Sequence, residues 1–274
     1  MKSMQLFDEI VNDNTSGSME LVRLLQAAVM QYLNSEETKF AELDTALRQV
    51  AAKRKEFPVV LHFIYHFLKE LEKAGASTEL FYIIEDYNRR WNTDTLIRDF
   101  YRDNAIPGKN ILVHSNSSTV TKTLEDFSGN KSECHIFQTF SSPAGEGMKQ
   151  ADTLADMGFP VTLLHENNAW NFSDELDMFL FGADRVEKER FMNKTGTALL
   201  CLMAREKKKP VFVLADPRKN IDDKVYRFLD VEPVEHPPEV DPDELAKAGK
   251  YPDIAIKNQY FEWIPCSLVT RFYS

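Results

Sequence analysis

The chain has 274 residues, of which 43% are hydrophobic, and its 33 basic and 43 acidic side chains give a net charge of −10. This length allows one large domain or two unequal ones, and the acidic balance argues against direct nucleic-acid binding, which needs clustered cations. No apolar stretch approaches a membrane span and no signal-peptide block opens the chain, so we expect a cytoplasmic protein without a membrane partner. The three cysteines lie far apart, so we expect no disulfide and no metal site. No cofactor is expected either.

Residues 1–105 are predicted to form a helical domain, because apolar side chains recur there at helical spacing and strand signals are scarce. His62 and His66 lie one helical turn apart, the spacing of a metal pair, but no third ligand is evident and a packed or surface pair is the preferred interpretation. Five helices are expected. The first covers 4–13, the second begins after a cap at Thr15 or Ser16, and the third covers 36–54. The fourth begins at Pro58, and the fifth begins near Thr78 and bends at 91–94.

From Ile106 onward, strand patterns alternate with helix patterns. Strands are predicted over 110–114, 134–139, 160–164, 178–182 and 210–215, and helices over 117–127, 144–157, 168–176 and 194–207. Continuous apolar runs are typical of parallel strands covered on both faces. The predicted fold class is therefore α/β, with a Rossmann-like doubly wound parallel sheet over 106–274. Within it, 231–253 is predicted to be a surface excursion, and 260–270 to dock on the domain or at a subunit contact.

A polar turn follows the first predicted strand. It contains His114, Ser115, Asn116, Ser117 and Ser118, and it leads directly into a helix. Unpaired backbone N–H groups and the positive end of the helix dipole suit a phosphate or carboxylate at such a place. The alternative is that these hydroxyl groups only cap the helix.

Polar turns also follow the other predicted strands, at the edge of the sheet where doubly wound folds bind ligands. The strand-end acid is Asp184, and the cations are Arg185, Lys194, Arg218 and Lys219. Each has a structural alternative: Asp184 as a turn brace, Lys194 as a solvated side chain, and His114 bonded to backbone.

Six segments together resemble one superfamily: 13–20, 114–120, 141–147, 182–184, 193–197 and 260–265. It comprises the alpha, beta and delta regulatory subunits of translation initiation factor 2B, methylthioribose-1-phosphate isomerase and ribose-1,5-bisphosphate isomerase. The resemblance covers nearly the whole chain. It implies a helical domain, a Rossmann-like domain, and assembly into homodimers or higher homo-oligomers.

The resemblance also implies roles for single residues. The isomerases carry a catalytic cysteine directly after the strand-end histidine and a catalytic aspartate in Gly-Ala-Asp, and these positions are Ser115 and Asp184 here. Their phosphate-binding arginine corresponds to Ser142. A serine hydroxyl cannot replace a thiol as an acid–base group at neutral pH without an activating base, and the regulatory subunits typically have serine at that position.

Two functional interpretations follow, and the first is preferred because a serine hydroxyl stands where the isomerases carry the thiol. In the first, a regulatory-type protein binds a sugar phosphate or nucleotide in a former isomerase site without turnover and also binds a protein partner. In the second, the chain is an aldose–ketose isomerase for a phosphorylated ribose of the ribose 1,5-bisphosphate or methylthioribose 1-phosphate type, with Asp184 and Ser115 at the catalytic positions and His114 or a water assisting Asp184. The expected ligand contacts are Ser16, Gly17, Ser18, His114, Ser115, Asn116, Ser117, Ser118, Ser142, Gly147, Asp184, Asn193 and Lys194.

Overall fold

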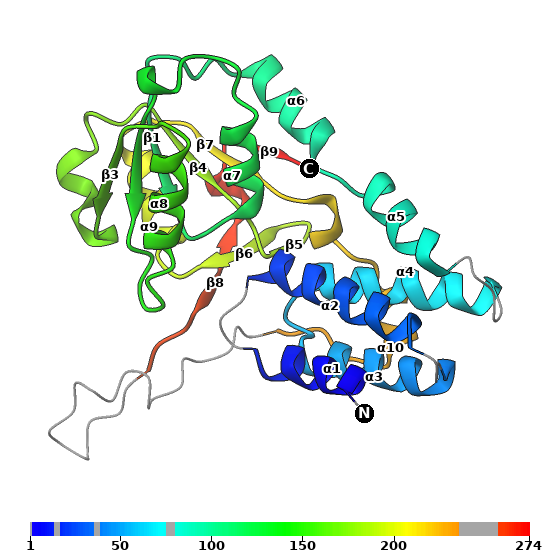
Figure 1. Ribbon diagram of the computed structural model, residues 1–274. Coiled ribbons are helices and arrows are strands. Elements are labelled where there is room, and N and C mark those ends of the chain that lie inside the picture. The colour runs from blue at the N-terminus through cyan, green and yellow to red at the C-terminus, as the bar shows by residue number, and fades with distance from the viewer. Residues whose placement is uncertain (1, 14–16, 36–38, 75–79, 236–256) are drawn as a thin grey trace, which may run out of the picture. The chain divides into compact units, whose positions relative to one another are not determined.

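The computed structural model describes residues 2–13, 17–35, 39–74, 80–235 and 257–274 (Figure 1). Its contacts divide the chain into two compact units, here called the helical unit and the sheet unit. The helical unit comprises Met1–Asn92 and Pro217–Glu235, and the sheet unit comprises Thr93–Asp216 and His236–Ser274.

These units divide the chain differently from the predicted boundary at 105/106. The helix α6 (Asp94–Asp103) belongs to the sheet unit, because Leu96, Ile97 and Phe100 are buried in its core. The helix α10 (Asp223–Leu229) belongs to the helical unit, where the Phe228 ring packs edge-on against Tyr65 at 5.2 Å. Each short helix has one apolar face, and the pattern alone does not say which core receives it.

The helical unit is built from amphipathic helices whose leucine, valine and phenylalanine side chains face inward. They are α1 (Lys2–Asn12), α2 (Ser18–Leu33), α3 (Phe40–Lys53), α4 (Pro58–Ala74) and α5 (Leu80–Arg90), with α10 and the 3-10 turn η3 (Pro217–Lys219). The predicted caps Thr15 and Ser16 lie outside the described residues, and Gly17 is the N-cap of α2. The His62 ring packs against His66 at 4.4 Å, and its Nδ1 lies 2.9 Å from the Tyr87 hydroxyl.

The sheet unit contains a six-stranded parallel sheet in the order β3-β2-β1-β4-β7-β9. Its strands are β1 (Asn110–His114), β2 (His135–Thr139), β3 (Val161–Leu164), β4 (Met178–Phe181), β7 (Val211–Leu214) and β9 (Arg271–Tyr273). The central helices are α7 (Ser118–Glu125), α8 (Gly147–Asp156) and α9 (Thr197–Glu206). The predicted α/β fold class is confirmed.

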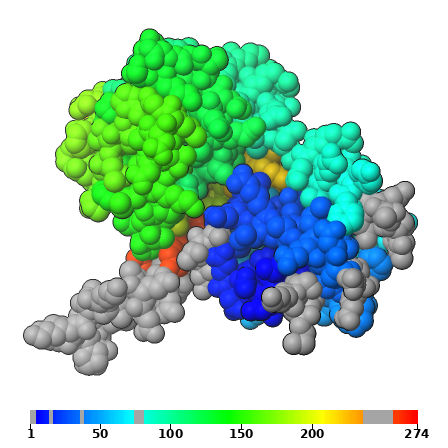
Figure 2. All heavy atoms as spheres, in the orientation of Figure 1, coloured from blue at the N-terminus to red at the C-terminus, as the bar shows by residue number. Residues whose placement is uncertain are grey.

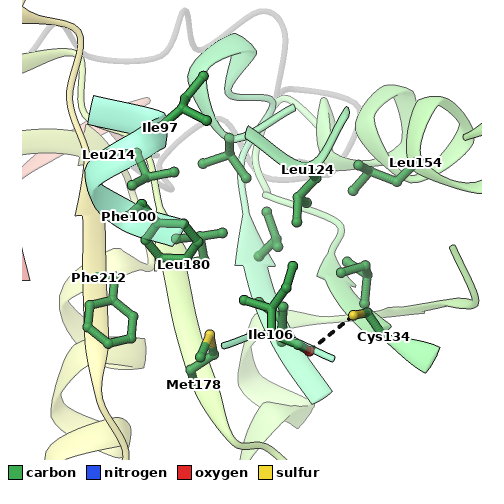
Figure 3. Close-up of a cluster of buried hydrophobic side chains, with 14 of the residues drawn as sticks. Ile97, Phe100, Ile106, Leu124, Cys134, Leu154, Met178, Leu180, Phe212 and Leu214 are labelled. Atoms are coloured by element: carbon green, nitrogen blue, oxygen red, sulfur yellow. Dashed lines mark hydrogen bonds between the residues drawn. The ribbon is translucent and has the colours of Figure 1, made fainter. Parts of the chain in front are cut away.

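Both faces of this sheet are covered, as its continuous apolar strands require. In β1, Ile111 and Val113 join the cluster that contains side chains of α6, α7 and α8, whereas Leu112 joins the cluster that contains side chains of α9. Figure 3 shows the first cluster, in which the Cys134 thiol also donates to the Ile106 carbonyl at 3.1 Å. In the space-filling view, the green segment around α7 and α8 forms the outer surface on one side of this unit (Figure 2).

The end of the chain forms two strands that periodicity did not predict. The segment β8 (Phe261–Pro265) joins β5 (Arg185–Val186) and β6 (Arg190–Lys194) in a three-stranded antiparallel sheet, and β9 pairs in parallel with β7. The helix predicted over 168–176 is a 3-10 segment, η2 (Glu166–Phe172). Among the described helices, none combines the length and the apolar character needed to cross a bilayer.

Candidate functional site

The carboxyl ends of β1, β2 and β4 are brought together by the parallel pairing of these strands. The last residue of β1, His114, is in register with Phe181 at the end of β4, and Val113 is in register with Gln138 of β2. The turn after β1 reverses sharply at Ser115, whose φ of 72° lies in the left-handed region. The backbone therefore presents Ser115 and the start of α7 at the edge where doubly wound sheets bind ligands.

His114 is fully buried and has a defined protonation state. Its Nε2 lies 3.0 Å from the Thr195 carbonyl, which can only accept, so Nε2 carries the hydrogen. Its Nδ1 then accepts from the Thr139 hydroxyl at 2.6 Å. Burial lowers the pKa of His114 to about 4, so the ring is neutral near pH 7. The structural alternative foreseen for His114, bonding to backbone, is what the geometry shows.

The Ser115 hydroxyl lies beside a carboxylate. Its Oγ donates to Glu146 Oε1 at 3.0 Å, and the Lys194 ammonium contacts the same oxygen at 2.8 Å. The Lys194 side chain is only 6% exposed, and its Nζ lies 4.7 Å from the centre of the Phe261 ring. Lys194 was predicted as a cation for a phosphate group, but in this structure its charge is already paired with Glu146.

The start of α7 is held by side chains from two elements. Ser117 is the N-cap and accepts from the Val120 N–H at 3.4 Å, and its own N–H donates to Gln150 Oε1 at 2.5 Å. Of the described residues, none accepts a hydrogen bond from the N–H of Ser118 or Thr119. The predicted capping alternative is thus correct for Ser117, while two first-turn donors of α7 are left for a ligand or water.

Two glycines let the backbone approach this turn closely. A Cβ on Gly147, at the start of α8, would lie 1.9 Å from the Thr139 carbonyl oxygen. A Cβ on Gly182, after β4, would lie 2.2 Å from Ser117 Oγ. Any side chain at either position would force the loops apart, so both glycines are required for packing. Gly147 was predicted as a ligand contact, and its position at the start of α8 stays compatible with that prediction.

Asp184 lies just past β4, at the start of the antiparallel hairpin. It is partly exposed, and its N–H donates to the Met192 carbonyl at 2.8 Å. Asn193 is buried, and its Nδ2 donates to Thr197 Oγ1 at 3.0 Å, so this amide braces the start of α9. Ser142 is exposed and its N–H donates to Glu166 Oε1 at 2.8 Å.

The remaining predicted residues have different surroundings. Asn116 is exposed in the turn after β1. Gly17 and Ser18 lie in the helical unit at the start of α2, Ser16 lies outside the described residues, and a contribution of these three to the site stays a prediction. Arg218 and Lys219 follow β7 in the chain and are assigned to the helical unit, so their place along the sheet edge stays a prediction. Arg185 forms an ion pair with Glu187 at 2.8 Å.

Sequence reasoning missed several residues that hold the site together. Glu146 and Gln150 lie four positions apart at the start of α8, and both reach the turn after β1. The four-residue spacing indicated that both side chains lie on the same side of the helix start. A glutamate in a glycine-containing turn is, however, equally compatible with a solvent-exposed side chain. Thr139 and Ser141 link the turn after β1 to the end of β2 and the loop that follows it. The Thr139 hydroxyl donates to His114 Nδ1 at 2.6 Å, and the Ser115 N–H donates to Ser141 Oγ at 2.7 Å.

A carboxylate from the C-terminal segment occupies the start of α9. Glu262 Oε1, on β8, accepts from the N–H groups of Gly196 at 2.9 Å and Ala198 at 2.8 Å. An anionic ligand therefore cannot use these donors unless Glu262 moves. Among the described residues, no group of three histidine, cysteine, aspartate or glutamate side chains is placed to hold a metal ion.

Comparison with known proteins links this geometry to a family. A model of the Initiation factor 2 subunit family matches residues 4–273. A curated ribose 1,5-bisphosphate isomerase from Methanocaldococcus jannaschii is 24% identical over 97% of this chain and 87% of its own length. The predicted resemblance to this superfamily is confirmed.

Solved structures show the same fold at low identity. The Pyrococcus horikoshii OT3 translation initiation factor eIF-2B superposes with a TM-score of 0.76 at 19% identity, covering 99% of this chain and 94% of that one. The 5-methylthioribose 1-phosphate isomerase of the same organism has a TM-score of 0.77 at 18% identity, covering 99% and 82%. Members of this group form oligomers, as in the tetrameric eIF2B-beta2-delta2 complex of C. thermophilum. A chain of that complex matches with a TM-score of 0.63 at 18% identity, and the match covers 99% of this chain and 88% of that chain.

Proposed function

The chain belongs to the initiation factor 2 subunit family, and on that premise we propose that its strand-end site binds a phosphorylated ribose and interconverts the aldose and ketose forms. The relative from Methanocaldococcus jannaschii, a ribose 1,5-bisphosphate isomerase, aligns with 97% of the chain. The expected substrate is of the ribose 1,5-bisphosphate or methylthioribose 1-phosphate type. We also propose that the chain assembles into homodimers or higher homo-oligomers.

The observation that carries this proposal is the hydrogen bond from Ser115 to Glu146. An aldose–ketose isomerase moves protons between neighbouring carbons and oxygens, so it needs acid–base groups at two places. Asp184 is one candidate. At the other position a serine hydroxyl alone is inadequate, but Ser115 Oγ lies 3.0 Å from the Glu146 carboxylate, so an acid–base group is within reach.

The start of α7 supports phosphate binding at the same place. The N–H groups of Ser118 and Thr119 have no acceptor among the described residues, and the positive end of the helix dipole favours an anion there. The arginine that the isomerases use for phosphate is replaced by Ser142, and Lys194 is paired with Glu146. With fewer cations available, backbone amides and hydroxyl groups would make most of the phosphate contacts.

The second candidate function is binding without turnover, as in a regulatory-type protein. The specific observation in its favour is that Ser115 and Ser142 replace the thiol and the arginine of the isomerases. Such a protein would hold a sugar phosphate or nucleotide in the same site and use other surfaces for a protein partner.

The two functions are separated by measuring binding and turnover together. We expect ribose 1,5-bisphosphate or methylthioribose 1-phosphate to raise the melting temperature, as any ligand of the native state does. Turnover is followed by NMR of the sugar carbons, and Asp184→Asn should abolish it. Asp174→Asn is the matched control, because this exposed aspartate pairs with Lys207 at 2.8 Å.

Each outcome decides between the proposals. Stabilisation together with turnover that disappears in Asp184→Asn supports the isomerase. Stabilisation without turnover supports the binding protein. No thermal shift with any phosphorylated sugar or nucleotide would contradict both.

A further inference from the structure

We infer that Glu146 supplies the acid–base group that the isomerases obtain from the thiol at the Ser115 position. This inference rests on the proposed isomerase function and assigns one of its two proton-transfer groups. It concerns only residues of the sheet unit.

The first oxygen of Glu146 is held by two donors. Oε1 accepts from Ser115 Oγ at 3.0 Å and lies 2.8 Å from Lys194 Nζ. Ser115 is the first residue after His114, the position at which the isomerases carry the reactive sulfur. A carboxylate oxygen therefore lies one hydrogen-bond length from the place where that sulfur would be. Two donors on the same oxygen, one of them charged, orient the carboxylate.

The second oxygen, Oε2, differs from the first in its surroundings. Glu146 Oε2 is buried and, among the described residues, makes no hydrogen bond. Leaving a buried carboxylate oxygen without a hydrogen bond is costly. Since Oε1 is occupied by Ser115 and Lys194, Oε2 is the oxygen with lone pairs available for a proton.

The reaction needs four proton events on a ribose whose C1 oxygen bears the phosphate. The ring oxygen O4 gains a proton as the C1–O4 bond breaks, and C2 loses its proton to form an enol. C1 then gains a proton, and O2 loses its proton as the C2 carbonyl forms. In total one hydrogen moves from C2 to C1 and one proton moves from O2 to O4, with no oxidant, reductant or co-reactant.

Two groups suffice for these events. Glu146 takes the proton from C2 and returns it to C1, while Asp184 gives a proton to O4 and takes one from O2. A glutamate carboxylate is the base in triosephosphate isomerase, which catalyses the same type of transfer between neighbouring carbons. Ser115 then acts as a positioning residue, because its hydroxyl holds the carboxylate through Oε1.

A purely structural role makes a different prediction. If Glu146 only neutralises Lys194, its replacement would lower stability through an unpaired buried charge and would lower activity only as a consequence. A thiol placed at residue 115 could not correct that defect. If Glu146 transfers protons, the same thiol replaces its function, since it restores the acid–base group of the isomerases.

The test compares Glu146→Gln, Ser115→Cys and the double variant with the wild-type protein. Turnover of ribose 1,5-bisphosphate and methylthioribose 1-phosphate, melting temperature and the thermal shift caused by each sugar are measured for every protein. Glu187→Gln is the matched control, because Glu187 is also an ion-paired glutamate of the sheet unit, contacting Arg190 at 2.7 Å. It should keep wild-type turnover, while the loss of its ion pair with the buried Arg185 at 2.8 Å lowers the melting temperature.

We expect Glu146→Gln to lower kcat by about 100-fold or more while the thermal shift with the sugar is retained. Adding Ser115→Cys to Glu146→Gln should restore turnover. Unchanged kcat in Glu146→Gln, or failure of Ser115→Cys to restore it, would overturn the role of Glu146 and leave the isomerase proposal intact. Absence of turnover in the wild-type protein would overturn both.

Discussion

Lowering the pH from 7 to 5 should destabilise the native protein specifically through His114. The ring is fully buried, its Nε2–H donates to the Thr195 carbonyl, and its Nδ1 accepts from the Thr139 hydroxyl. Protonation would add a charge inside the core, a cost that the Glu166 carboxylate 4.0 Å from Nδ1 offsets only in part. For these reasons the native state holds the neutral ring, and burial lowers the pKa of His114 to about 4.

The sign and size of the effect follow from proton linkage. The unfolded chain protonates this histidine near pH 6.5, whereas the native state does so only near pH 4. Between these values the unfolded state binds more protons, so stability is fully present above about pH 6.5 and falls as the pH drops toward 4. Between pH 7 and pH 5 the loss from this one residue is ~2 kcal/mol.

The assay compares the wild-type protein with His114→Gln, whose side chain does not titrate. Urea unfolding at pH 7, 6 and 5 should show a steeper loss of stability in the wild type, whatever constant offset the substitution causes. In NMR spectra, the signal that His114→Gln removes should report a neutral ring with hydrogen on Nε2 at pH 5.5. Equal pH dependence in both proteins, or a native titration midpoint near 6.5, would refute the argument.

Two further predictions concern packing around the site. Gly147→Ala should lower the free energy of unfolding by ~2–3 kcal/mol in urea titrations, because its Cβ would lie 1.9 Å from the Thr139 carbonyl oxygen; a change below about 0.5 kcal/mol would show that the loop yields easily. Glu262→Gln should lower the free energy of unfolding by ~1 kcal/mol, because a carboxylate that accepts from the Gly196 and Ala198 N–H groups at the start of α9 is lost. Thermal unfolding measures this effect, and an unchanged melting temperature would contradict it.

The parallel sheet was predictable because its strands carry their own signal. The run from Asn110 to His114 is a strand in the structure with the predicted bounds, and Met178–Phe181 differs from its prediction by one residue. A strand buried on both faces needs apolar side chains at every position, and few other local structures show that pattern. Arg271–Tyr273 lacks it, since this short edge strand is defined by its hydrogen bonds to β7.

The candidate site was predictable in part. The polar turn from His114 to Ser118 and the acid Asp184 stand at strand ends, and parallel pairing necessarily gathers strand ends at one edge. The partners of these residues were not predictable. Glu146 lies 31 positions from Ser115, and its carboxylate reaches the hydroxyl only because the loop before α8 packs against the turn after β1.

The sequence by itself determined the helical and parallel-sheet architecture, the family and the strand-end positions, because these depend on local periodicity and on short motifs. Tertiary structure alone decided that α6 belongs to the sheet unit and α10 to the helical unit. It also decided that Lys194 forms an ion pair with Glu146 and that Ser115 donates to the same carboxylate. The physical reason is that each of these depends on which side chains meet across long chain separations. An apolar face, a lysine or a serine has the same local pattern whatever it finally contacts, and only packing selects the partner.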